Sequence, residues 1–154
     1  MHYMDVNLVA VLACAVAAMI VGFLWYSPAL FAKPWVKEMG YDMNDTAAMA
    51  KMKKSAGPAY AASFVGSLVT AAVLAKILNA LSRHGDTLPY HPVALAQPWI
   101  YGVKVALAVW LGFVATVQLT GVLFANQSAK LFAINTGYQF ACYAVMGAIL
   151  AVWK

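Results

Sequence analysis

Four long apolar runs without any aspartate or glutamate constrain this chain most strongly. They cover residues 6–26, 58–81, 99–124 and 131–153. A helix needs about 20 apolar residues to cross a bilayer core of roughly 30 Å. The whole chain is 64% hydrophobic and 10% charged, which leaves too few polar side chains to cover a soluble domain. The sequence therefore predicts an all-α, polytopic membrane protein, a four-transmembrane-helix bundle that forms one domain over residues 1–154.

The composition changes between the first two runs, where five lysines and three acidic residues occur within residues 27–57. Asn44, Asp45 and Thr46 are good N-cap residues, and the following AAMAKMKKSA places lysines toward a helix end, as the helix dipole prefers. We expect a cytoplasmic interfacial helix in this first loop. Pro58 suits the first position of the next helix.

Lysine and arginine predict the orientation, because cytoplasmic loops carry an excess of both. The loops after the first and third runs share one side, and they contain Lys33, Lys37, Lys51, Lys53, Lys54 and Lys130. The other side has Arg83 and Lys154, together with Lys76 and Lys104 if these snorkel outward. Both termini are therefore expected outside. The scattered basic residues favour the anionic inner leaflet of the lipid bilayer as a partner, and no nucleic acid.

Two sequence blocks resemble a known family. The first is GFLWYSP at residues 22–28 with Phe31, Lys33 and Trp35; the second joins WLGF at 110–113, LF at 123–124, LF at 131–132 and INTGYQ at 134–139. Together they resemble the prokaryotic membrane family catalogued as domain of unknown function 1761. The resemblance implies a small four-span protein of the prokaryotic inner membrane, and it brings no activity or catalytic residue. The connector over residues 82–98 does not match the family pattern.

An aromatic cluster of Trp25, Tyr26, Phe31 and Trp35 falls where the first span meets the cytoplasmic surface. One interpretation is an interfacial belt, in which indole and phenol groups stay wet while their rings lie at the lipid boundary. The other is that the break at Pro28 folds the segment back, so that the aromatic side chains grip an amphipathic ligand.

The fourth run carries Asn135, Gln139, Cys142 and Met146 at helical spacing, with Tyr138 beside them. Polar groups avoid lipid, so this face should look into the bundle. It serves either interhelical hydrogen bonds, with partners such as Thr116, Gln118, Thr120 or Thr70, or a polar cavity. Our candidate ligand site is Trp25, Tyr26, Trp35, Asn135 and Tyr138.

Small residues in the second run, Ala62 with Gly66 and Ser63 with Ser67, follow the spacing that lets helices approach closely. Lys76 and Lys104 either snorkel or form an anion or lipid head-group site between the second and third spans. His2, His84 and His91 fall on one predicted side, but their spacing is no metal signature, so we predict no metal and no cofactor.

No acidic residue or histidine lies inside a span, which argues against carboxylate-coupled ion transport and against haem ligation. No nucleophile and base pair is evident, so an enzyme is the least favoured class. Two functions remain open. The first is a binding or transport module, whether channel, carrier or lipid-interacting protein, with its site near the cytoplasmic ends of the first and fourth spans. The alternative is a structural or accessory subunit of a larger membrane complex; a homo-oligomer is compatible with either.

Overall fold

The computed structural model describes residues 6–83 and 96–153, and these residues form helices without any strand. The helices are α1 (Leu8–Trp25), α2 (Ala32–Glu38), α3 (Thr46–Arg83), α5 (Pro98–Val109), the π-helical turn η2 (Trp110–Ala115), α6 (Thr116–Phe124) and α7 (Ala129–Val152). The expectation of an all-helical chain is confirmed for the described residues.

Three helical segments are long and apolar enough to cross a membrane: Leu8–Trp25, Thr46–Ser82 and Pro98–Phe124. Helix α7 has 24 residues but is not among them. Its first half contains Asn135, Thr136 and Gln139, and these polar residues lower its hydropathy. The membrane class is thus supported by three helices, while a fourth span remains a prediction.

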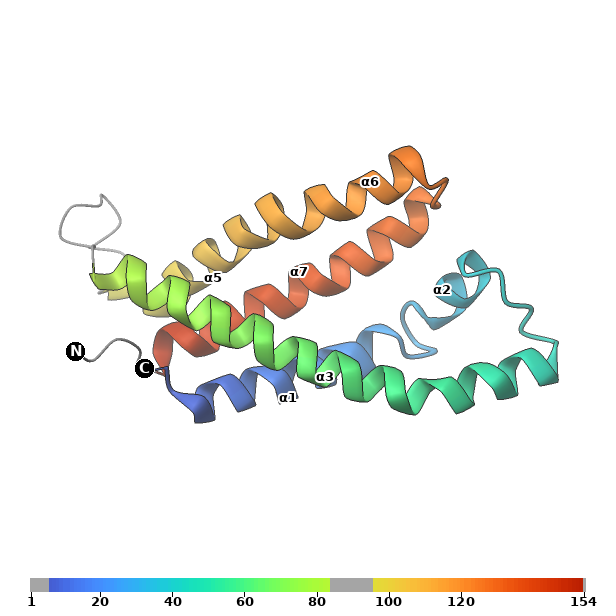
Figure 1. Ribbon diagram of the computed structural model, residues 1–154, viewed down its shortest axis with the longest axis horizontal. Helices are drawn as coiled ribbons and strands as arrows, with labels where there is room; N and C mark the ends of the chain where they lie inside the picture. Colours follow the sequence, from blue (N-terminus) through green and yellow to red (C-terminus); the bar gives the residue numbers. More distant parts are fainter. Residues whose placement is uncertain (1–5, 84–95, 154) are drawn as a thin grey trace.

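Helix α7 is the centre of the arrangement (Figure 1), since it packs against α1, α2, α3, α5 and α6. Helix α1 lies between α7 and α3, and α5 covers another side of α7. In contrast, α3 and α5 barely touch each other. The bundle is therefore open between α3 and α5. Its main buried cluster combines Ala10, Cys14 and Ala18 with residues of the other long helices, namely Ala71, Leu74, Leu78, Ala106, Cys142 and Met146.

The closest helix contact joins α5 and α7 through glycines. A Cβ on Gly102 would overlap the backbone carbonyl of Gly147, and a Cβ on Gly147 would lie 2.6 Å from that of Ala106. The expected contact at Ala62 and Gly66 does not occur, because both residues are exposed and nothing lies within 4 Å of a Cβ placed on Gly66. Small residues do let two helices approach here, but they lie on α5 and α7.

The first loop also differs from expectation. The predicted interfacial helix is not a separate element, because its residues form the first turns of α3, which continues through Pro58. Asp45 caps this helix by accepting hydrogen bonds from the backbone N–H groups of Ala47 and Ala48. Alanine, methionine and lysine are strong helix formers, which favours a helix in the segment before Pro58. A continuous helix also keeps more backbone groups hydrogen-bonded than a break would, although the proline itself removes one donor. The separate helix of the loop is α2 instead.

The third run is not a uniform α-helix, since residues 110–115 form a π-helical turn between α5 and α6. The Thr116 hydroxyl donates to the Gly112 carbonyl at 2.7 Å. This bond gives a carbonyl of the π-helical turn a hydrogen-bond donor. A short turn follows α6: Asn126 has a φ of 51°, and Ser128 caps α7 by accepting hydrogen bonds from the backbone N–H groups of Lys130 and Leu131.

The α5–α7 contact yields a stability prediction. Gly102→Ala should lower the free energy of unfolding by about 1–3 kcal/mol, because the added methyl group has backbone as its neighbour and the two helices must separate. Thermal unfolding in detergent measures the loss. Gly66→Ala is the control, with open space around its Cβ, and an equal loss in both variants would contradict a specific α5–α7 contact.

Candidate functional site

The site begins where the chain reverses after α1. Tyr26 closes α1 by donating its N–H to the Gly22 carbonyl, and Phe31 donates its N–H to the Trp25 carbonyl at 3.1 Å. These bonds fold the Pro28 segment back, so that α2 packs against α7 with Val36 buried. A short loop thereby carries aromatic side chains from two helices to the first half of α7.

Three aromatic donors bind two neighbouring acceptors on α7. The indole Nε1 of Trp25 donates to the Ile134 carbonyl at 3.0 Å. The Asn135 side-chain oxygen, Oδ1, accepts from the Tyr26 hydroxyl and from the Trp35 Nε1, each at 3.1 Å. The single atom Asn135 Oδ1 therefore links the C-terminal end of α1 and helix α2 to α7.

The rings of the cluster also pack on one another. Tyr26 lies with its ring centroid 5.5 Å from that of Trp35 and 5.3 Å from that of Tyr138, while the Tyr138 hydroxyl donates to the Ala18 carbonyl at 3.4 Å. Gly137 leaves room for an indole, since a Cβ there would lie 3.0 Å from Trp25 Cζ2. Both distances between ring centroids are in the range of favourable aromatic pairs.

The structure thus brings all five residues of the candidate ligand site together, from α1, its C-cap, α2 and α7. We call Trp25, Tyr26, Trp35, Asn135 and Tyr138 the aromatic clamp. Its aromatic side chains all donate to protein acceptors, so the clamp first of all holds helices together. No described residue accepts from the Asn135 amide N–H groups, which leaves these two donors for another molecule. Ligand binding by the clamp remains a prediction.

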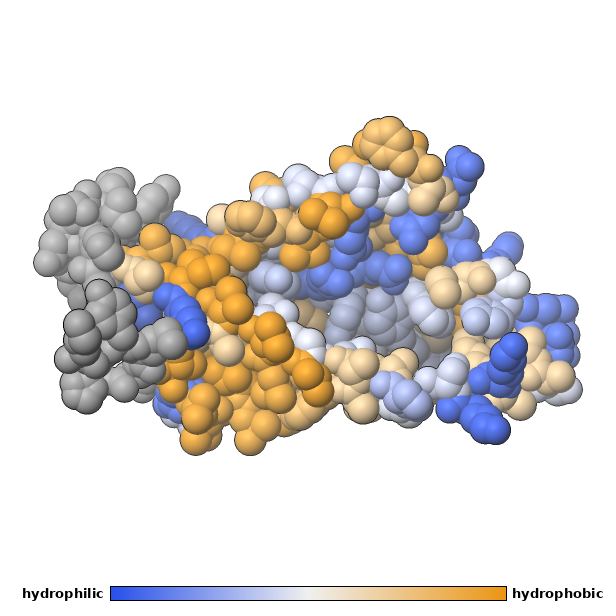
Figure 2. Space-filling model, viewed as in Figure 1, coloured by the Kyte–Doolittle hydropathy of each residue, from blue (hydrophilic) through white to orange (hydrophobic). Residues whose placement is uncertain are grey.

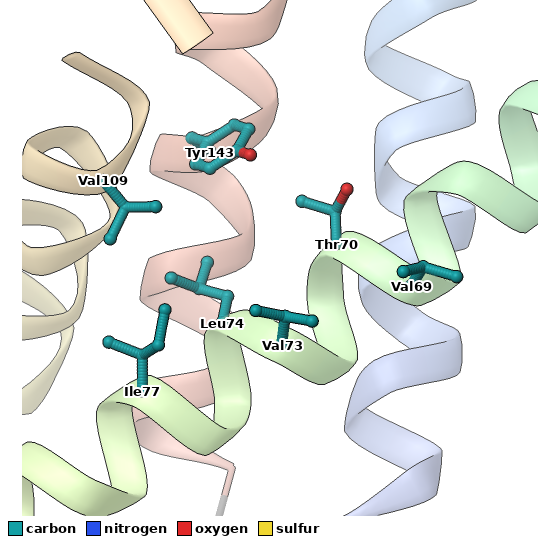
Figure 3. Close-up of a pocket in the computed structure, with 7 residues that line it drawn as sticks. All are labelled: Val69, Thr70, Val73, Leu74, Ile77, Val109 and Tyr143. Carbon is teal, nitrogen blue, oxygen red and sulfur yellow. The ribbon is translucent and has the colours of Figure 1, made fainter. Parts of the chain in front are cut away.

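A second feature lies in the opening between α3 and α5, where a cavity of about 190 Å³ reaches α7 (Figure 3). The cavity is lined by Val69, Thr70, Val73, Leu74, Ile77, Val109 and Tyr143. Thr70 and Tyr143 supply the only hydroxyl groups of this lining, and its other side chains are aliphatic. Of these residues the sequence singles out only Thr70, because the cavity depends on how far α3 stands from α5.

The polar face of α7 continues from this cavity toward the clamp. Gln139 precedes Tyr143 by one helical turn, and its amide makes no hydrogen bond with the described residues. The Thr136 hydroxyl donates to Gln118 Oε1 of α6 at 2.9 Å, an interhelical bond of the predicted kind. Thr120 instead donates to the Val117 carbonyl of its own helix. Figure 2 shows hydrophilic colours along the middle of this face, between α6 and α3.

The remaining candidates are not assembled into a site. Lys76 and Lys104 are both exposed, and neither makes an ion pair with a described residue. The anion site between them remains a prediction. His2, His84 and His91 lie outside the described residues. Within residues 6–83 and 96–153, no group of three metal-ligating side chains could hold a metal ion.

The clamp makes a prediction about stability. Asn135→Ala should reduce the free energy of unfolding by about 1–3 kcal/mol, because the Tyr26 hydroxyl and the Trp35 indole would both lose their acceptor in a half-buried site. Thermal unfolding in detergent, followed by circular dichroism, measures the change.

Gln139→Ala is the matched control, since it removes an amide one turn further along α7 that bonds no described residue. Its unfolding temperature should stay near that of the wild type. If the two variants lose the same stability, the bonds to Asn135 Oδ1 do not hold the clamp together.

The comparisons with known proteins add the family. No curated protein and no solved structure matches the chain. A family model does: the one described as "Protein of unknown function (DUF1761)" matches residues 9–151, which is nearly the whole chain. The matched range includes the clamp, the cavity and all of the long helices except their outermost residues. The resemblance stated from the sequence motifs is thereby confirmed, and the chain belongs to the DUF1761 family.

Proposed function

We propose that this protein is a four-span bundle of the prokaryotic inner membrane that binds an amphipathic, bilayer-borne molecule in a groove along α7. With 24 residues, α7 is about 36 Å long, enough to cross the bilayer core. Its polar residues pack toward α1, α2 and α6, which makes such a span tolerable in lipid. The six lysines after the first and third spans support a cytoplasmic position for the clamp.

The observation that carries the proposal is the change of chemistry along one groove. Its first part is the apolar cavity between Val69, Val73 and Val109. Gln139 is not part of the lining, but residues four apart share a helix face, so it lies on the Tyr143 side of α7 about 6 Å along the helix axis. An apolar trough that ends at unpaired amide donors suits a molecule with a hydrocarbon chain and a hydrogen-bond-accepting head group.

The size of the cavity supports a lipid-like ligand over a compact one. Pockets that enclose a small molecule have volumes of roughly 300–1,000 Å³. At about 190 Å³ this cavity is smaller, and it is open on the side between α3 and α5. It therefore accommodates part of a chain whose remainder stays in the bilayer. The amide N–H groups of Gln139 and Asn135 are the donors for the head group.

The alternative of a structural subunit has one observation in its favour. Apolar side chains are exposed along η2 and α6, among them Leu111, Phe113, Val117, Leu123 and Phe124. A larger membrane partner would cover them, but lipid requires the same surface. Because the exposed face fits both situations, whereas the groove combines an apolar cavity with free amide donors nearby on α7, we favour ligand binding.

A bulky residue in the groove tests the proposal. Val73→Trp fills the cavity, so protein extracted in mild detergent should lose a co-purifying lipid-like molecule, with at least tenfold lower occupancy in native mass spectrometry. Intact mass and lipid extraction identify what is bound.

Val65→Trp is the matched control, because Val65 lies on the same helix, is similarly exposed, and does not line the cavity. It should keep the bound molecule. Equal occupancy in both variants, or wild-type protein that carries no such molecule, would refute the groove as a binding site. Stoichiometric purification with a larger protein would favour the structural subunit.

A further inference from the structure

Three lysines near the start of α3, Lys51, Lys53 and Lys54, are exposed and carry charge that the nearby acids do not neutralise. Asp45 accepts from the backbone at the helix start, and Asp42 accepts from the N–H of Asn44. Glu38 lies 3.8 Å from Lys130 of α7. Within the described residues, each acid of this loop thus already has a partner, and none of these partners is one of the three lysines.

The position of these lysines relative to the membrane follows from α1. The ring of Tyr60 lies 5.4 Å from that of Phe23, which places Tyr60 level with the last turn of α1. The clamp residues Trp25 and Tyr26 lie at the same end, where aromatic side chains mark the membrane surface. Lys54 precedes Tyr60 by six residues, so it lies about 9 Å further outward. This is the layer of lipid head groups.

The other end of α3 supports the same placement. Lys76 is the next charged residue of α3 after Lys54. The two lie 22 positions apart in the sequence, which corresponds to about 33 Å of helix. That length matches a hydrocarbon core of roughly 30 Å. Lys54 and Lys76 therefore bracket the core, and Lys76 reaches the opposite head-group layer.

The lysines share one half of the helix circumference. Successive residues turn by about 100°, so Lys51 and Lys54 lie about 60° apart and Lys53 lies about 100° beyond Lys54, which places all three within an arc of about 160°. Helix α3 continues without a break from these lysines to Lys76, so it passes through the head-group layer and does not lie along it. The three lysines therefore reach lipid head groups on one side of α3.

We propose that Lys51, Lys53 and Lys54, which we call the lysine collar, bind the phosphates of anionic phospholipids on one side of α3. Lysine acts as a point charge toward phosphate, and juxtamembrane lysines are attracted by the negative potential of anionic lipids. Tyr41 and Met43, exposed in the preceding loop, give the same region apolar side chains that enter a lipid surface. This combination favours a lipid surface over an acidic protein as the partner. The proposal is independent of the groove.

The test uses full-length protein in detergent, titrated with phosphatidylglycerol and followed by native mass spectrometry. The variant Lys51→Gln, Lys53→Gln, Lys54→Gln should weaken binding by about fivefold per lysine, and up to about a hundredfold in total. The matched control is Lys33→Gln, Lys37→Gln, Lys130→Gln, which removes the same charge on the same side of the molecule. The charge-preserving Lys51→Arg, Lys53→Arg, Lys54→Arg variant should bind like the wild type.

The outcomes are distinguishable. A loss confined to the collar variant, absent with phosphatidylcholine and reduced in 0.5 M salt, supports the collar. Equal losses in the collar and control variants mean that net charge alone attracts the lipid, and this overturns the proposal, as does unchanged binding in the collar variant. Circular dichroism of each variant checks that α3 is intact. An acidic protein that displaces phosphatidylglycerol from the wild type would identify a protein partner and also overturn it.

Discussion

The first half of α7 carries polar side chains among apolar helices, and the rest of the structure depends on how these side chains are paired. A polar group without a partner in hydrocarbon costs several kcal/mol. Two of these polar side chains have partners on neighbouring helices. The Trp35 indole and the Tyr26 hydroxyl donate to Asn135, and the Thr136 hydroxyl donates to Gln118 of α6. The reversal of the chain after α1 brings α2 to this position. A loop that looks like a simple connection is thus part of the packing of α7.

The second half of α7 is held by a different interaction. Beyond Tyr143 this half has no polar side chain, and it packs instead by shape, with Gly102 and Gly147 in backbone contact. Close approach of backbones is the usual source of helix association in membranes, where lipid removes the hydrophobic driving force. One end of α7 is therefore fixed by hydrogen bonds and the other by van der Waals contact, so the loss of either should loosen only its own end.

Much of this arrangement follows from local sequence. The apolar runs predict the long helices, and the predicted topology places the aromatic residues around Pro28 at the same end of the bundle as Asn135. The hydrogen bonds from Tyr26 and Trp35 to Asn135 are not predicted, because the sequence offers threonine and glutamine side chains as partners instead. Two further features do not follow from the sequence. Ala62 with Gly66 has the same spacing as Gly102 with Ala106, and spacing alone cannot tell which pair meets a neighbour. Proline ends many helices, yet α3 continues through Pro58 because strong helix formers precede it.

The groove depends on long-range packing that no local pattern encodes. Helix α3 leans on α1 and reaches α7 only over a short stretch, while α5 is drawn to α7 by its glycine. The opening is thus a consequence of two contacts made elsewhere, α1 with α3 and α5 with α7. A ligand that enters it would lie against side chains already fixed in position, and it would not have to order them on binding.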